Sequence, residues 1–500
     1  MSDLEKGEQP HPSPAATRTP ATEPSHTSEE DPNLVDFDGP NDPANPKTWS
    51  FNKRWAATGL VSLITFMTPM TSSMIAPAAP SIKHDLHVKS QFESELIFSI
   101  FLLGFVVGPL FLAPMSEVYG RVIVLQLANI FFLIFNLASG FAQTTAQLLV
   151  LRFLSGLGAC APQTIGGGVL SDLWTAKERG RAVGLYTLAP LLGPALGPLI
   201  GAWIDQRTTW RWCFWSVTIF GTTVQILIAL TLRETYTPRI LALKAKRLRK
   251  ETGNEKLHTK WEGPGVTPIK VLRRSIFRVF ILLGTQPIVQ FLSTFMALIY
   301  GVIYLMLATF PQVWTEIYHQ STGVAGLNYI SLMIGCTAGA QANGFLLDVV
   351  WRRLDARKLK NQESPEFRIP LMVVATFLTS AGLLIYGWSA QKHTHWIVPN
   401  IGTLIFGAGS TMTFTCIQTY TIDAYPTYAA SAIGASAVAR AMTGFGFPLF
   451  ADAMFDSIGY GWGNTILALA MLLVGYVGAY VLWFFGKRLR KASPYASGEI

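Results

Sequence analysis

The chain has 500 residues, of which half are apolar and only 14% are charged, and its formal net charge is +9. Together with a positive mean hydropathy of +0.34, this composition excludes an ordinary soluble protein and indicates one that spans a membrane. The surplus of basic residues follows the membrane topology described below, so it does not call for a nucleic acid partner.

Residues 1–48 are rich in Pro, Ser, Thr and Glu and have almost no apolar periodicity. Such a segment cannot bury enough apolar surface to order itself. We therefore expect a disordered cytoplasmic tail over 1–48.

Apolar stretches of about 20 residues, long enough to cross a hydrocarbon core of roughly 30 Å, occur twelve times after this tail. Their approximate limits are 55–79, 94–114, 122–142, 147–170, 181–203, 211–232, 284–310, 324–347, 369–389, 396–420, 428–451 and 463–486. We expect an all-α membrane protein built from two six-helix bundles. The divisions are an N-terminal bundle over 49–232, a cytoplasmic linker over 233–275, a C-terminal bundle over 276–486 and a cytoplasmic tail over 487–500.

The basic residues predict the orientation. Of the 39 Lys and Arg, 32 lie in segments on the side of the amino terminus, five lie in segments on the other side and two lie within spans. Cytoplasmic segments of membrane proteins carry such an excess, so we expect both termini in the cytoplasm. The linker region 233–278 alone carries 13 basic and four acidic residues. It is predicted either to form a helix on the anionic inner leaflet or to be a plain solvated linker.

The second span leads into a short loop that contains Glu117, Gly120 and Arg121, in which the glycine supplies a tight turn. A related pattern recurs after the eighth span, 231 residues later. There Gly344, Leu346, Asp348 and Arg352 have the spacing of Ala113, Met115, Glu117 and Arg121. The repeat favours a duplicated transporter bundle; an ordinary solvated loop is the alternative.

Two arginines fall within predicted spans. Arg152 lies in the fourth span, which ends at Asp172, and Arg440 lies in the eleventh. An arginine in a span costs roughly 2.5–3.5 kcal/mol on insertion scales, and such groups usually face a cavity or a partner. We expect both to be functional; for Arg152, extension of the side chain to the nearer membrane surface is the alternative.

The fifth span carries an unusual alternation of glycine and proline, GLYTLAPLLGPALGPLIG over 184–201. Gly193, Gly197 and Gly201 are four residues apart, so they line one helix face and let another helix approach closely. The interleaved prolines, among them Pro194 and Pro198, each remove a backbone donor. We expect a bent or soft helix that belongs to a moving part; a plain packing helix is the alternative.

Polar and aromatic residues in other spans are candidates for a substrate cavity. Suitable side chains for weakly polar compounds are Gln163, Tyr186, Tyr300, Tyr304, Phe414 and Gln418. For the aromatic residues, packing is the alternative. Asp423 follows at the end of the tenth span. No carboxylate falls at the middle of a span, and Glu95, at the start of the second, is our candidate for the proton carrier because a buried carboxyl can hold a proton.

The sequence contains no nucleophile and base in a catalytic arrangement, no paired cysteine spacing and no GxxxxGK[ST] motif. We therefore expect no catalytic residues, no metal and no cofactor. The missing GxxxxGK[ST] motif argues against an ATP-driven pump.

These features together resemble the major facilitator superfamily, specifically the fungal drug:proton antiporters with twelve spans, over about 45–490. The motifs that carry the resemblance are the loop at Glu117, Gly120 and Arg121, LRFLSGLGA around Arg152, the pairs Gly193-Pro194 and Gly197-Pro198, RETY at 233–236, CIQTYTIDAYP ending at Pro426, and YGWGN at 460–464.

The resemblance implies two bundles, related by pseudo-two-fold symmetry, that alternately open a central cavity to either side of the membrane and export amphipathic small molecules in exchange for protons. It also implies an inner charge cluster of Glu117, Arg121 and Asp172 and a proton-coupling role for Arg152. The Gly-Pro pairs would set the conformational bias of an antiporter. Val118 and Val122 depart from this pattern by leaving fewer charges in the loop, and Gln286 stands where Glu is frequent.

The exported compounds would be drugs, toxins or a secondary metabolite. An importer or facilitator of the same fold, for a nutrient or a polyamine, is the alternative, and a receptor or membrane enzyme is a third possibility. The resemblance further implies a monomer, in contact with membrane lipids, in the plasma membrane.

Overall fold

The computed structural model describes residues 31, 33–39, 42–175, 178–261, 268–358, 365–425 and 428–497. Within these residues the regular secondary structure is helical, and an isolated β-bridge joins Leu34 and His258. The helices before the linker are α1 (Phe51–Ser73), α2 (Ala79–Asp85), α3 (Gln91–Tyr119), α4 (Arg121–Ser139), α5 (Thr145–Ala159), α6 (Ala161–Leu173), α7 (Arg179–Arg207) and α8 (Arg211–Thr231).

The linker contains α9 (Thr237–Thr252). The helices after it are α10 (Pro268–Thr285), α11 (Pro287–Gln312), α12 (Thr322–Leu327), α13 (Tyr329–Lys358), α14 (Ile369–Gln391), α15 (Ile397–Ala424), α16 (Ala429–Gly446), α17 (Pro448–Lys491) and α18 (Pro494–Ser497). Short helical turns η1 (Pro46–Thr48), η2 (Val313–Ile317) and η3 (Pro365–Arg368) complete the described elements.

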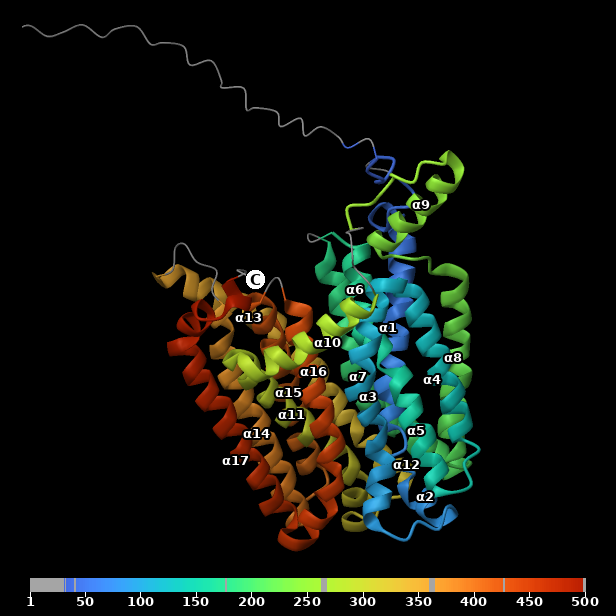
Figure 1. The fold of residues 1–500 in the computed structure, drawn as a ribbon. Helices are drawn as coiled ribbons and strands as arrows, with labels where there is room; N and C mark the ends of the chain where they lie inside the picture. Colours follow the sequence, from blue (N-terminus) through green and yellow to red (C-terminus); the bar gives the residue numbers. More distant parts are fainter. Residues whose placement is uncertain are drawn as a thin grey trace, which may run out of the picture.

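The long helices form two bundles that stand side by side with their axes roughly parallel (Figure 1). Helices α1 to α8 make the first bundle, and α10, α11 and α13 to α17 make the second. The short helix α12 contacts α7 of the first bundle. We call the end at which α1 begins and α17 ends the terminal side, and the opposite end, near α2, the far side.

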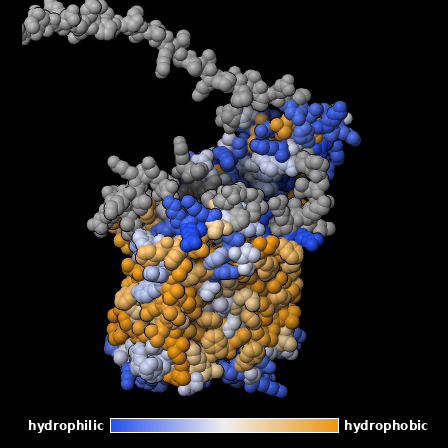
Figure 2. Space-filling model, turned by 60° about the vertical axis from the view of Figure 1, so that its left-hand side comes forward, coloured by the Kyte–Doolittle hydropathy of each residue, from blue (hydrophilic) through white to orange (hydrophobic). Residues whose placement is uncertain are grey.

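The surface of the two bundles carries an apolar band between hydrophilic ends (Figure 2). Among the described residues, nine helical segments are long and apolar enough to cross a membrane. Helix α1 is not one of them, because it carries many Thr and Ser residues that are buried inside the protein. Thr65 and Thr71 each donate to a carbonyl four residues earlier, at 2.7 and 2.8 Å, so their hydroxyls are satisfied without water.

Three expected spans are each divided by a proline at or near the start of the second piece. The fourth span consists of α5 and α6, with Pro162 just after the break. In the seventh span, the first residues belong to the end of α10, and α11 begins at Pro287. The eleventh consists of α16 and the first part of α17. Proline cannot continue a preceding helix without loss of a hydrogen bond. Within α17 the chain turns back at Gly459, whose φ of +77° lies in the left-handed region.

The glycines of α7 contact the backbone of α1. An added Cβ at Gly193 would lie 2.8 Å from the Phe66 carbonyl oxygen, and one at Gly197 or Gly201 would clash with the carbonyl oxygen of Met70 or Met74. Helix α7 runs without interruption through Pro190, Pro194 and Pro198. The predicted small-residue face is thus the surface on which α1 and α7 approach each other.

Helices α3 and α5 approach in the same way. An added Cβ at Gly104 would lie 2.5 Å from the Gly156 backbone, and one at Gly156 would clash with the Phe101 carbonyl oxygen. This contact lies one helical turn from Arg152, so it brings that side chain next to the backbone of α3.

The linker helix α9 lies beyond the terminal side, next to residues 33–39 and 42–49 (Figure 1). Lys244 Nζ lies 2.6 Å from Asp38 Oδ1 and donates to the Asp36 carbonyl oxygen at 2.9 Å. Residues 33–39 therefore contact the linker, although their composition predicts a disordered tail. The linker itself contains the helix α9 and is not a plain solvated chain.

Substitution of Gly201 by Ala is expected to destabilise the protein by about 1–3 kcal/mol, the usual cost of overpacking a close contact. Gly167 is the matched control, because it lies in a helix and has no atom within 4 Å of an added Cβ. Thermal unfolding of purified variants in detergent checks this. An equal melting temperature for Gly201→Ala and Gly167→Ala would contradict the role of the close α1 to α7 contact.

Candidate functional site

A cavity of about 60 Å³ lies between the two bundles and is lined by both. This volume is below the roughly 300–1,000 Å³ of typical small-molecule sites. The lining is largely apolar and aromatic with a few polar groups, and includes Gln163, Pro190, Pro194, Tyr300, Tyr304, Cys336, Ser410, Thr411, Phe414 and Arg440.

Arg440 of α16 is the charged group of this lining. Its Nη2 donates to Gln163 Oε1 of α6 at 3.1 Å, a hydrogen bond between the bundles. The guanidinium carbon lies 5.2 Å from the ring centroid of Tyr300 and 5.6 Å from that of Phe414, distances at which a cation is attracted to an aromatic face. Among the described residues, no Asp or Glu lines the cavity.

A second, smaller hollow of about 20 Å³ extends from Arg440 towards the terminal side. It is lined by residues of α11, α15 and α16, including Gln418, Thr421 and Ser436. Arg440 borders both spaces and so stands between the central cavity and the terminal side.

Most of the predicted cavity residues meet here. Gln163, Tyr300, Tyr304 and Phe414 line the central cavity, and Gln418 lines the second hollow. Tyr186, also expected in the cavity, lines neither. Its hydroxyl donates to the Pro162 carbonyl at 2.9 Å, so it links α7 to α6.

Hydrogen bonds join the bundles on the far side of the cavity. The hydroxyls of Ser72 and Tyr304 lie 2.7 Å apart, and the amide of Gly323 donates to Gln206 Oε1 at 2.8 Å. Tyr304 is fully buried. These contacts close the cavity towards the far side.

Arg152 is buried, with 1% of its surface exposed. Its Nε donates to the Ile97 carbonyl at 2.8 Å and its Nη2 to the Phe98 carbonyl at 3.3 Å. The guanidinium also lies within 6 Å of two aromatic ring centroids, those of Phe101 and Phe214. The side chain therefore does not extend to the membrane surface, because the glycine contact between α3 and α5 brings carbonyl acceptors within its reach.

Glu95 and Asp452 form a buried acidic pair across the two bundles near the far side. Glu95 is 7% exposed and Asp452 is 8% exposed. The amide nitrogen of Gln91 donates to Asp452 Oδ2 and, at 3.4 Å, to Glu95 Oε1. Gln312 also donates to Asp452 Oδ2, at 3.1 Å. The sequence identified Glu95 but gave no sign of its partner, because the two residues are 357 positions apart.

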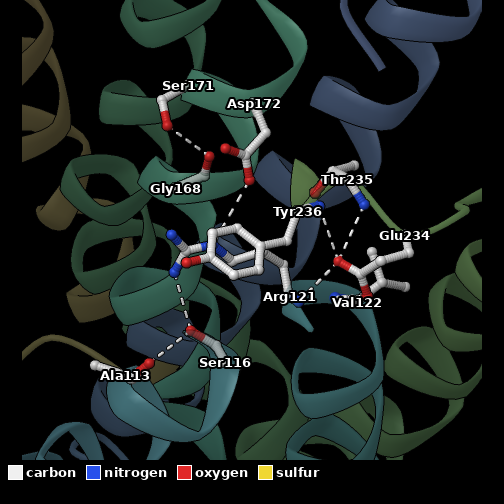
Figure 3. Close-up of polar contacts among 10 residues, drawn as sticks. All are labelled: Ala113, Ser116, Arg121, Val122, Gly168, Ser171, Asp172, Glu234, Thr235 and Tyr236. Carbon is white, nitrogen blue, oxygen red and sulfur yellow. Dashed lines mark hydrogen bonds and ion pairs between the residues drawn. The ribbon is translucent and has the colours of Figure 1, made fainter. Parts of the chain in front are cut away.

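The terminal side of the first bundle holds a second polar cluster (Figure 3). Arg121 Nε lies 3.6 Å from Asp172 Oδ2, Nη1 donates to Ser116 Oγ at 3.0 Å, and the guanidinium carbon lies 4.7 Å from the Tyr236 ring centroid. An added Cβ at Gly168 would lie 2.9 Å from Arg121 Cζ, so this glycine leaves the space that the arginine occupies.

Glu234 completes this cluster from the linker. Its carboxylate accepts hydrogen bonds from the amides of Arg121 and Val122, at 2.8 and 3.2 Å. These amides begin α4, where unpaired N–H groups and the helix dipole favour a negative charge. Gly120 has a φ of +108°, and an added Cβ there would clash with Glu234 Oε2.

Tyr236 covers the arginine from the same segment. Burial raises the pKa of the Tyr236 phenol above its usual value, so the ring stays uncharged at neutral pH. Neither Glu234 nor Tyr236 was identified as a site residue from the sequence, although RETY contributed to the resemblance.

Glu117, expected in this cluster, is exposed and makes no ion pair with a described residue. Its charge acts on the Tyr236 phenol, and Glu234 supplies the carboxylate that accepts from the amides at the start of α4. Asp348 and Arg352 lie within α13, but their side chains are outside the described part of the structure. Asp423 pairs with Arg368 Nε at 2.7 Å on the terminal side.

The chain resembles known proteins over most of its length. The family model described as Major Facilitator Superfamily matches residues 61–448. The chain is 47% identical over 481 residues to the efflux pump vrtL of Penicillium aethiopicum, which covers 96% of this chain and 94% of that protein. It is 41% identical over 462 residues to the efflux pump radE of Floropilus chiversii, with 92% and 86% covered.

Solved structures show the same fold at low sequence identity. The xylose transporter XylE from E. coli, in a partially occluded inward open conformation, matches with a TM-score of 0.62 and 18% identity, covering 87% of this chain and 98% of that one. A bacterial homolog of the human lysosomal transporter Spinster matches with a TM-score of 0.60 and 16% identity, covering 89% and 99%.

Substitution of Glu234 by Ala is expected to destabilise the protein by about 1 kcal/mol or more, because it removes the group that caps α4. Glu251→Ala is the control, since Glu251 is exposed and pairs with Arg247 on the surface of α9, a pair that contributes little. Thermal unfolding of both purified variants checks this. Equal melting temperatures would show that the cap is dispensable.

Proposed function

The chain belongs to the major facilitator superfamily, and from this premise we propose that it exports amphipathic small molecules across a membrane in exchange for protons. Its fold is that of the superfamily, with two six-helix bundles. The observation that carries the proposal is the central cavity, which both bundles line. A site between two such halves can be exposed to either side by their relative motion.

The terminal side faces the cytoplasm in this proposal. The excess of Lys and Arg in the tail, linker and terminal-side loops supports that orientation. Relatives named as efflux pumps support the outward direction. The protein acts as a monomer in the plasma membrane.

The hydrogen bonds on the far side fit one stage of an export cycle. With Ser72 bound to Tyr304 and Gln206 bound to Gly323, the cavity is closed towards the exterior. Arg440 and the second hollow then lie on the cytoplasmic approach to the cavity, through which a compound would enter.

We assign proton binding to the pair formed by Glu95 and Asp452. Both carboxylates accept from the same Gln91 amide. Two ionised carboxylates so placed repel each other, and one proton shared between them removes the repulsion. Because one acid lies on α3 and the other on α17, protonation favours contact between the bundles on the far side. Lys83 is an ionisable group near the pair, and its Nζ donates to Gln91 Oε1 at 3.1 Å. Glu316 and Asp456 lie near Tyr460, on which the charge of Asp452 also acts.

Arg152 has a positioning role in this scheme. It binds the carbonyls of Ile97 and Phe98, which follow Glu95 directly on α3. Loss of this contact would let α3 shift against α5 and move Glu95 relative to Asp452.

The remaining predicted residues act on conformation. Pro190 and Pro194 of α7 line the cavity, while Gly193 and Gly197 hold α7 against α1. A change in the path of α7 would therefore alter the cavity directly. The cluster of Arg121, Asp172 and Glu234 ties the α3 to α4 turn to α6 and the linker on the cytoplasmic side.

Cells that express the chain are expected to accumulate less of a fluorescent amphipathic compound, and a protonophore is expected to abolish this difference. Glu95→Gln and Asp452→Asn should each weaken the coupling by a factor of about 5–150, the range of typical coupling energies. Asp456→Asn is the matched control, because Asp456 is an exposed acid one turn beyond Asp452.

Initial efflux rates at equal expression, with Arg152→Ala included, provide the measurement. Export that persists with the protonophore would contradict proton coupling. Export by Glu95→Gln and Asp452→Asn at the wild-type rate would remove the pair from the mechanism, and raised accumulation would indicate import.

A further inference from the structure

Arg440 gives the central cavity a charge that no described carboxylate neutralises. Within the described residues, neither space that Arg440 borders is lined by Asp or Glu, and no carboxylate oxygen lies within ion-pair distance of its guanidinium. The Arg440 guanidinium donates instead to the neutral amide of Gln163. A guanidinium has five N–H donors, so donors remain for a ligand.

We propose that the cavity selects amphipathic anions, namely flat aromatic or polycyclic compounds that carry one carboxylate or ionised phenol, with the anion at Arg440. The inference rests on the proposed function and names its substrate class. A cation away from water is unfavourable without a partner, and an anionic ligand provides that partner.

The surroundings of Arg440 fit the apolar part of such a compound. Tyr300 and Phe414, whose rings lie near the guanidinium, and Pro190 and Pro194 on the opposite bundle offer flat apolar surfaces. Aromatic side chains favour stacked or edge contacts with ligand rings. An arginine held between rings is well suited to bind a planar carboxylate through two parallel hydrogen bonds.

The same features disfavour other substrate classes. A cationic compound or a polyamine would meet the charge of Arg440 without an acid to offset it. A sugar would leave most of its hydroxyls facing an apolar lining, because the polar groups of the described lining are, besides Arg440, those of Gln163, Ser410, Thr411 and the tyrosine hydroxyls. Compounds with one negative charge and a large ring system satisfy both parts of the site.

The charge of the substrate also affects how export is driven. Inward movement of a proton and outward movement of a monovalent anion both carry positive charge into the cell. The exchange is therefore electrogenic, and a membrane potential that is negative inside favours it together with the pH gradient.

Binding of two dyes with the same ring skeleton tests the proposal. Fluorescein is an anion at neutral pH, and rhodamine 123 is a cation. Anisotropy titrations of each dye with the purified full-length chain in detergent are expected to show that fluorescein binds about tenfold more tightly or better. A wild-type chain that does not bind fluorescein more tightly than rhodamine 123 would overturn the proposal.

Two substitutions locate the selectivity. Arg440→Gln is expected to weaken fluorescein binding by about tenfold or more, and Arg440→Lys to retain most of it. Gln163→Glu keeps the arginine but places an acid where the amide oxygen now lies 3.1 Å from it, and it should weaken fluorescein binding similarly even if Arg440→Gln folds poorly. Lys392→Gln, which removes a cation exposed outside the cavity, is the control.

Unchanged fluorescein affinity in both folded variants, Arg440→Gln and Gln163→Glu, would overturn the anion site. The titrations contain no ion gradient, so they are independent of proton coupling. In proteoliposomes, fluorescein binding without gradient-driven transport would contradict the proposed function while leaving the anion site intact. Gradient-driven transport of rhodamine 123 in preference to fluorescein would contradict the anion site while leaving the proposed function intact.

Discussion

A charged group in a membrane protein must find its partners inside the protein, because the lipid offers none. Arg121, Arg152 and Arg440 meet this requirement in different ways. Arg121 is paired with Asp172 and covered by Tyr236, Arg152 binds two backbone carbonyls of α3, and Arg440 has a neutral amide and two aromatic rings. Of the three, Arg440 borders the central cavity and keeps its charge available to a ligand.

Close approach of helices makes these arrangements possible. Gly168 leaves room for the Arg121 guanidinium, and the contact of Gly104 with Gly156 places Arg152 against α3. A larger residue at either place would separate the arginine from its partners. Packing and electrostatics are therefore coupled here, since the glycines that let helices touch also determine which polar groups the cations reach.

Much of the architecture could be predicted from local pattern. Apolar stretches of membrane-spanning length predicted the helices, and Gly193, Gly197 and Gly201 predicted a close helix contact, which α1 provides. The breaks at Pro162 and Pro287 were missed because an apolar run conceals a helix boundary. Asp172 pairs with Arg121 as expected, and Glu234, which the sequence did not indicate, reaches the turn after α8 has crossed back to the terminal side.

The sequence by itself determined that the chain spans a membrane, which side carries most of the basic residues, and which charged residues lie within spans. Those properties depend on composition and on spacing along a single helix. Only the tertiary structure decided which groups these charged side chains meet, because that depends on contacts between distant segments: Glu95 and Asp452 through Gln91, Arg152 with the carbonyls of α3, and Arg440 with Gln163. Backbone carbonyls in particular carry no sequence signal, since every residue has one.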